Sequence, residues 1–250
     1  MPDHIVSSYD NDLDRLRRLI SEMGGIAEKM TDEASLALVR RDTGLAQSVI
    51  VADKRLDALQ REIEEKSVLL IARRQPLAID LRETISSIRV SGDLERIGDL
   101  AKNIAKRVLA ISDEAQPQKI VQGVQHMSDL VQEQLKDVLD AYAGRDTKAA
   151  HDVWERDGAI DALYNSLFRE LLTYMMEDPR NISFCTHLLF CAKNIERIGD
   201  HTTNIAETIQ YLATGENPTG ERPKNDASNY ATVSPQGAAA ESAPPGPSAA

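Results

Sequence analysis

The pentapeptide Glu95-Arg96-Ile97-Gly98-Asp99 occurs twice in this chain, the second time as Glu196-Arg197-Ile198-Gly199-Asp200. Three further segments recur in the same order: Asp42-Thr43 as Asp146-Thr147, Asp53-x-x-x-Asp57 as Asp157-x-x-x-Asp161, and Pro76 as Pro179. The offsets drift only from 104 to 101, which chance does not explain for matches in a fixed order. The chain is therefore predicted to be an internal duplication, in which each copy is one supersecondary unit.

The residues around the pentapeptides predict long helices. Apolar side chains recur at spacings of three and four from Leu94 to Ile111 and again from Ile195 to Leu212, which is the stripe of a helix packed in a bundle. Prolines and Asp-Thr pairs interrupt the helix-forming segments and mark the junctions between them. The predicted helices cover residues 9–40, 43–72, 77–111, 118–142, 146–176 and 180–212.

These helices define an all-α protein built from two tandem, internally duplicated three-helix bundles. The short junctions predict that neighbouring helices are antiparallel. The first bundle is expected over residues 1–112 and the second over 113–213. Residues 214–250 are rich in proline and alanine, and Val233 is their only aliphatic side chain larger than alanine. Such a segment buries too little apolar surface to offset its ordering entropy, so a disordered tail is expected.

The composition excludes several classes of function. The formal net charge is −11, which argues against sequence-independent binding of nucleic acid. No apolar run approaches the length of a membrane span, so no direct membrane insertion is expected. The N-terminal residues lack the pattern of a secretory signal, and the two cysteines, Cys185 and Cys191, do not form a disulfide framework. A reduced, cytoplasmic protein is the expectation.

Each half carries two pairs of carboxylates spaced four residues apart, so each pair lies on one helix face. In the first half the pairs are Asp53 with Asp57 and Glu95 with Asp99. Counted from the turn at Pro76, a rise of about 1.5 Å per residue places Asp57 level with Glu95 and Asp53 level with Asp99 on antiparallel helices. The second half repeats the arrangement about Pro179 with Asp157, Asp161, Glu196 and Asp200.

Four neighbouring carboxylates repel one another unless a cation lies among them. An all-oxygen ligand set suits hard or borderline ions. We therefore expect a metal ion, of which iron, manganese, magnesium and zinc are the candidates, at each set of four. The positions lie off the apolar stripe, which predicts a shallow site open to solvent. A solvated helix face with ordinary ion pairs explains the same residues without metal.

The segment from Arg89 to Ala105, with its Glu-Arg-Ile-Gly-Asp core, resembles the PhoU family, as do the duplicated bundles. The resemblance covers about residues 9 to 212 and implies an accessory protein of phosphate transport that is not an enzyme and has no catalytic residues. It implies negative regulation of the phosphate regulon and of phosphate uptake. The implied partners are a sensor histidine kinase, the ATPase or membrane part of the phosphate ABC transporter, and a second copy in a homodimer.

The resemblance also implies that the eight carboxylates hold the metal. The second copy has Lys193-Asn194 where the first has Gly92-Asp93, so identical metal content at the two sites is in doubt. Two alternatives stay open. A carboxylate-bridged di-metal oxidoreductase would normally carry Glu-x-x-His motifs pointing into the bundle core, and this sequence has none. A metal-free helical scaffold is the other alternative.

Overall fold

The computed structural model describes residues 2–112 and 118–216, and it describes side chains for 11–112 and 120–216. The helices are α1 (Pro2–Arg40), α2 (Thr43–Arg74), α3 (Ile79–Ala110), α4 (Gln118–Gly144), α5 (Thr147–Glu177) and α6 (Ile182–Thr214). Across these described ranges the only other regular element is a short 3-10 helix, η1 (Pro179–Asn181). The predicted all-α class is thus confirmed, while the predicted disordered tail lies, apart from its first residues, outside the described residues.

The helix ends differ from the predicted ones where proline acts. Helix α1 begins at Pro2, because proline is well suited to a first helical turn. Pro179 likewise opens η1, and α6 follows it. At the two predicted Asp-Thr junctions, the aspartate caps the helix that follows. The Asp42 carboxylate accepts a hydrogen bond from the Leu45 amide at 2.9 Å, and Asp146 caps α5 in the same way.

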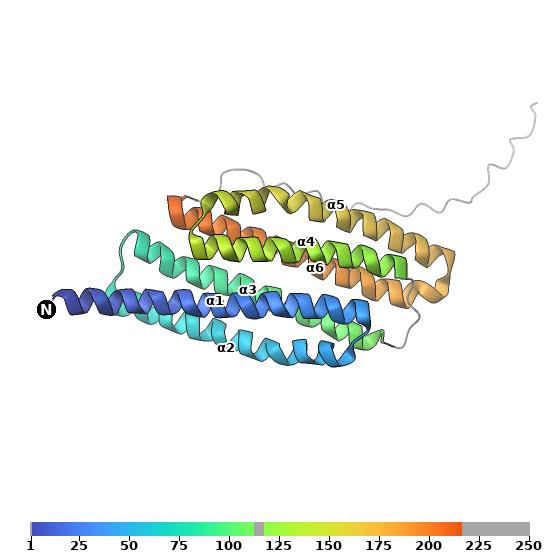
Figure 1. The fold of residues 1–250 in the computed structure, drawn as a ribbon, viewed down its shortest axis with the longest axis horizontal. Helices are drawn as coiled ribbons and strands as arrows, with labels where there is room; N and C mark the ends of the chain where they lie inside the picture. The colour runs from blue at the N-terminus through green and yellow to red at the C-terminus, as the bar shows by residue number, and fades with distance from the viewer. Residues whose placement is uncertain (1, 113–117, 217–250) are drawn as a thin grey trace, which may run out of the picture.

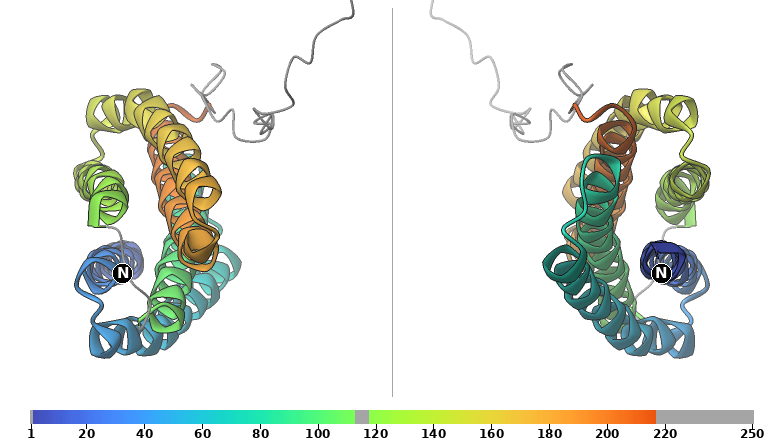
Figure 2. Two further views of the ribbon diagram at one scale, coloured as in Figure 1. Left: turned by 90° about the vertical axis from the view of Figure 1, so that its right-hand side faces the viewer. Right: turned by 90° about the vertical axis from the view of Figure 1, so that its left-hand side faces the viewer.

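Helices α3 and α6 lie side by side at the centre, each with the two other helices of its own half, and α1 lies beside α4 (Figure 1, Figure 2). Helix α3 therefore packs against three helices, as does α6. The buried apolar side chains form one cluster that runs from Leu13 to Ile209 through both halves. Because the core is shared, the division into two domains at residues 112 and 113 stays a prediction. Of the helices described, none has the length and apolar character needed to cross a bilayer.

The glycine of each pentapeptide makes room for a neighbouring helix. A Cβ atom on Gly98 of α3 would collide with the Cδ2 atom of Leu56 on α2. The equivalent contact in the second half is looser, because a Cβ atom on Gly199 would lie 3.2 Å from Cδ1 of Ile160. Leu56 and Ile160 are themselves equivalent, being 104 residues apart. Close helix packing therefore explains why glycine stands mid-helix in both copies, despite its helix propensity about 1 kcal/mol below that of alanine.

A buried carboxylate joins the two halves. Glu83 of α3 is 4% exposed. Its carboxylate accepts hydrogen bonds from Arg17 of α1 at 2.5 Å and from Arg145, in the turn between α4 and α5, at 2.5 Å. Both guanidinium groups reach solvent, so the carboxylate is paired without fully burying either cation. These two ion pairs tie the α4–α5 turn of the second half to α1 and α3 of the first.

Candidate metal centre

In the first half a lysine ammonium group lies between two of the predicted ligands. Lys102 Nζ is 2.6 Å from Asp53 Oδ2 and 2.6 Å from Asp99 Oδ1. Burial lowers the pKa of Lys102, but its hydrogen bonds to these two carboxylates outweigh burial and raise it overall. Asp53 and Asp99 therefore share one cation at the same height of the α2–α3 pair, as the counting from Pro76 predicts.

The other two carboxylates of the first half lie near this ion pair. Burial raises the pKa of Glu95, and the charge of Asp99 adds to the rise. Arg96, which lies 3.6 Å from both Glu95 and Asp99, opposes it. The charges of Asp57 and Asp53, like that of Asp99, raise the pKa of Glu95. The four side chains thus share one electrostatic environment, in which Lys102 and Arg96 supply the positive charge.

The second half has a different set of partners. Thr203, which is equivalent to Lys102, donates a hydrogen bond to Asp157 at 3.0 Å. The lysine of the second set is Lys193, whose Nζ lies 3.0 Å from Glu196 Oε1. Lys193 precedes its pentapeptide in the sequence, whereas Lys102 follows its own. The duplication thus preserves the carboxylates but exchanges the cation that accompanies them. Because the two sets of carboxylates have different partners, we do not expect the two sites to have identical metal content.

Glu196 is the most strongly perturbed carboxylate of the two sets. The residue is 4% exposed, and its Oε2 atom is buried without a hydrogen-bond partner in the described part of the chain. Burial raises the pKa of Glu196 to about 7. The hydrogen bond from Lys193 acts against the rise, and the charges of Asp200 and Asp161 add to it.

The predicted openness of the sites is wrong for half of the eight carboxylates. Asp53, Asp157, Asp161 and Glu196 are each 6% exposed or less. Glu196 lies on α6, which packs against three helices. Asp53 lies on α2, and Asp157 and Asp161 lie on α5, and each of these helices packs against two others, so a position off the main apolar stripe is still covered by a neighbour. A deeply buried carboxylate is costly unless it is protonated, paired or bound to a cation.

The fit of a metal ion differs between the halves. In residues 11–112 and 120–216, no three His, Cys, Asp or Glu side chains gather in a ligating arrangement. The unpartnered Glu196 Oε2, which the charges of Asp161 and Asp200 influence, is an oxygen that a cation would satisfy. In the first half the Lys102 ammonium group already pairs with Asp53 and Asp99, so a metal ion would have to displace it.

One polar cluster between the halves was missed by the sequence reasoning. Asp93 of α3 lies 2.9 Å from Nδ1 of His201 and accepts a hydrogen bond from Asn204 at 3.2 Å, both on α6. Asn204 therefore turns its amide nitrogen toward the other half. The signal that could have indicated this cluster is that two of its three members differ from the residues at the equivalent positions: His201 is equivalent to Leu100, and Asp93 to Asn194.

The fold and the paired acidic motifs define a class of duplicated, all-helical bundle proteins, and two solved structures share the fold. A crystal structure of PhoU from Pseudomonas aeruginosa has a TM-score of 0.81 and 40% identity, covering 83% of this chain and all of that one. The phosphate transport system regulatory protein PhoU from Streptococcus pneumoniae has a TM-score of 0.78 and 30% identity, covering 84% of this chain and 99% of that one.

Sequence comparison gives the family. The PhoU domain model matches residues 20–108 and 124–209, one match in each half. A phosphate-specific transport system accessory protein PhoU homolog from Rhizobium meliloti is 60% identical over 223 residues, which is 89% of this chain and 94% of that protein. A Caulobacter vibrioides protein with the same name is 52% identical over 90% of this chain. The chain belongs to the PhoU family.

Proposed function

We propose that this protein is a non-enzymatic accessory regulator of phosphate transport. The observation that carries the proposal is the 60% identity to a phosphate transport accessory protein over nearly the whole length of both chains. The Streptococcus pneumoniae protein of the same fold is called a regulatory protein of the phosphate transport system. Long helices with exposed faces suit a protein that acts by contacting other proteins.

The proposal extends to partners and direction. The protein lowers phosphate uptake and phosphate-regulon expression when phosphate is abundant, and it couples the phosphate ABC transporter to a sensor histidine kinase. It acts in the cytoplasm as a homodimer. These finer statements rest on the family resemblance of the pentapeptide segments. They are consistent with a chain of net charge −11 that lacks a nucleotide-binding glycine loop, since its effect on genes must then pass through a partner.

Deletion of the gene in its host tests this regulatory role. Phosphate-regulon transcription is expected to rise in phosphate-rich medium, because the restraint on the kinase is lost. The rise should vanish when the sensor kinase gene is also deleted, and a plasmid copy of this gene should restore repression. Transcription is measured with a promoter fusion. A deletion strain that keeps the regulon silent at high phosphate would refute the proposal.

We also propose that the eight carboxylates bind metal ions, more weakly in the first half than in the second. The second half offers the partnerless oxygen of Glu196, whereas Lys102 competes for the first half. The second half is therefore expected to fill first when metal is limiting. Without added metal, the ion pairs of Lys102 with Asp53 and Asp99 favour a first half that holds no metal.

Alanine at Asp57, Glu95 and Asp99 together should empty the first site and leave the second occupied. The matched control is the mirrored triple variant, with alanine at Asp161, Glu196 and Asp200, which should empty the second site alone. Removing carboxylates takes away the negative charge that attracts the cation. Elemental analysis of each protein after dialysis against iron, manganese, magnesium and zinc in turn gives the stoichiometry. Equal metal content in wild type and both variants would rule out these ligands.

A further inference from the structure

The turn between α2 and α3 carries an unusual group of exposed side chains. Eight large apolar side chains are exposed within the described ranges, and four of them lie in this one segment: Val68, Leu69, Leu77 and Ile79. Leu77 is the most exposed, at 79%. The same segment, from Lys66 to Ile79, contains three cations and no carboxylate. We call these apolar residues, together with Lys66, Arg73 and Arg74, the turn surface.

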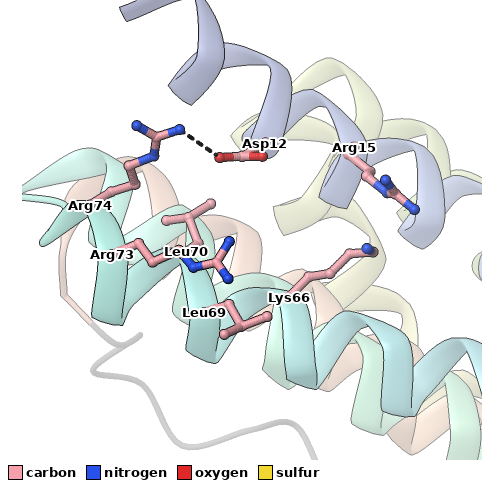
Figure 3. Close-up of a pocket in the computed structure, with 7 residues that line it drawn as sticks. All are labelled: Asp12, Arg15, Lys66, Leu69, Leu70, Arg73 and Arg74. Carbon is pink, nitrogen blue, oxygen red and sulfur yellow. Dashed lines mark hydrogen bonds and ion pairs between the residues drawn. The ribbon is translucent and has the colours of Figure 1, made fainter. Parts of the chain in front are cut away.

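A small basic pocket adjoins the turn surface. It has a volume of about 130 Å³ and lies between α1 and α2, lined by Asp12 and Arg15 of α1 and by Lys66, Leu69, Arg73 and Arg74 of α2 (Figure 3). Asp12 pairs with Arg74 at 3.4 Å. Glu62 lies within 3.4 Å of both Arg15 and Lys66. Four cations therefore meet two carboxylates here, which leaves a local excess of positive charge.

The fold itself does not require this charge, as the duplication shows. Measured from Pro76 and Pro179, the equivalents of Arg73 and Arg74 are Met176 and Glu177. Residues 66–79 carry a charge of +3, whereas the equivalent residues 169–182 carry two arginines and three carboxylates, a charge of −1. The two turns lie at opposite ends of the molecule (Figure 1). Since the two turns connect equivalent pairs of helices, α2 with α3 and α5 with α6, the basic charge of the first is a property that packing does not explain.

We propose that the turn surface binds the anionic face of a phospholipid bilayer. Lysine and arginine beside exposed aliphatic side chains are the combination found where proteins lie on membrane surfaces. The surface comprises the turn between α2 and α3 and the adjoining helix ends, at the end of the molecule where α1 begins (Figure 1). The pocket has the volume of about four water molecules, which suits a phosphate headgroup and is too small for a peptide helix. The chain binds there without spanning the bilayer.

The electrostatic contacts act locally despite the net charge of −11. At physiological ionic strength the Debye length is about 8 Å, so Glu64 and Glu65, which lie about 12 Å or more along α2 from Arg73 and Arg74, are largely screened from those two cations, although they adjoin Lys66. Each cation near an anionic bilayer increases binding about fivefold. Leu77 and its apolar neighbours then reach the boundary between headgroups and acyl chains, where burial of an aliphatic side chain is favourable.

The test is co-sedimentation of the full chain with vesicles. Wild type is expected to bind mixed phosphatidylcholine–phosphatidylglycerol vesicles, to bind pure phosphatidylcholine vesicles far more weakly, and to be released by high salt. Replacing Lys66 and Arg73 by glutamine should weaken binding roughly 30-fold, since two surface cations are lost. The control removes two exposed cations from α5, Lys148→Gln with Arg169→Gln, and should leave binding unchanged.

A second pair of variants separates the apolar contribution. Leu77→Ser should weaken vesicle binding about tenfold, whereas Met176→Ser, at the equivalent turn of the second half, should not change it. Equal binding of wild type and the Lys66, Arg73 variant would overturn the proposal, as would equal binding to neutral and anionic vesicles. Binding to immobilised polyglutamate as strong as to the vesicles, lost in the same variant, would show that the surface recognises acidic protein segments instead. Circular dichroism melts confirm that each variant is folded.

Discussion

Replacing Phe184 by alanine is expected to lower the free energy of unfolding by about 3–5 kcal/mol, close to the whole stability of some domains of this size. Phe184 lies near the start of α6 and is 2% exposed. It is the largest of the fully buried side chains, and the core that surrounds it is shared by both halves. The truncation leaves a cavity that the packed helices can only partly fill. Urea denaturation followed by circular dichroism measures the loss.

The matched control lies on the same helix. Phe190 is 48% exposed, and its ring stacks with the guanidinium of Arg107 at 4.0 Å from the ring centroid. Phe190→Ala should therefore cost only about 1 kcal/mol, the size of an exposed cation–π contact with a little lost burial. Similar losses for the two variants would contradict the assignment of Phe184 to the core.

The second large effect is a pH dependence set by Glu196. Its pKa is raised to about 7 in the folded protein, chiefly by burial, while in the unfolded chain it has the ordinary value of 4.5. Between these two values the folded state keeps a proton that the unfolded state has lost. The contribution of Glu196 to stability is therefore fully present below pH 4.5 and is lost as the pH rises through about 7. The loss is roughly 3 kcal/mol.

The Glu196→Gln variant isolates this contribution from those of other carboxylates. In metal-free protein at pH 8 it should be roughly 3 kcal/mol more stable than wild type, because the uncharged amide has no ionisation penalty on burial. At pH 4.5 the two proteins should be nearly equal. Glu177→Gln, which alters an exposed glutamate at the end of α5, is the control and should follow wild type at both pH values. Thermal melts in chelator provide the comparison, and a difference that does not change with pH would contradict the raised pKa.

The helices were predictable because their signals are local. The apolar stripe, the proline junctions and the Asp42 and Asp146 caps depend on residues within one or two turns, and the structure reproduces them within a few residues. The largest difference is at the start of α1, which begins at Pro2 instead of residue 9. The equal heights of Asp53 and Asp99 were also predictable, since the rise of a helix is constant and the turn at Pro76 fixes the register.

Side-chain burial and long-range pairing were not predictable from single helices. A position off the stripe of α6 was expected to face solvent, yet Glu196 is buried, because three helices surround α6. The bridging Lys102 was missed for a related reason. A flexible lysine reaches several neighbours, and which one it contacts depends on how α2 and α3 are rotated against each other.

The sequence by itself determined the all-α class, the duplication, the register of the helices and the identity of the eight carboxylates. Repetition is found by comparing the sequence with itself, and periodicity and capping depend on neighbouring residues. None of the three requires knowledge of how the helices pack. The tertiary structure decided which cation accompanies each set, that Asp93 of the first half meets His201 of the second, and that Glu83 joins α1 to the α4–α5 turn. The contacts of Lys102 with Asp53, of Glu83 with its two arginines and of Asp93 with His201 join residues 49 to 108 positions apart. Only the packing of α3 against α6, with the helices around them, brings such residues together.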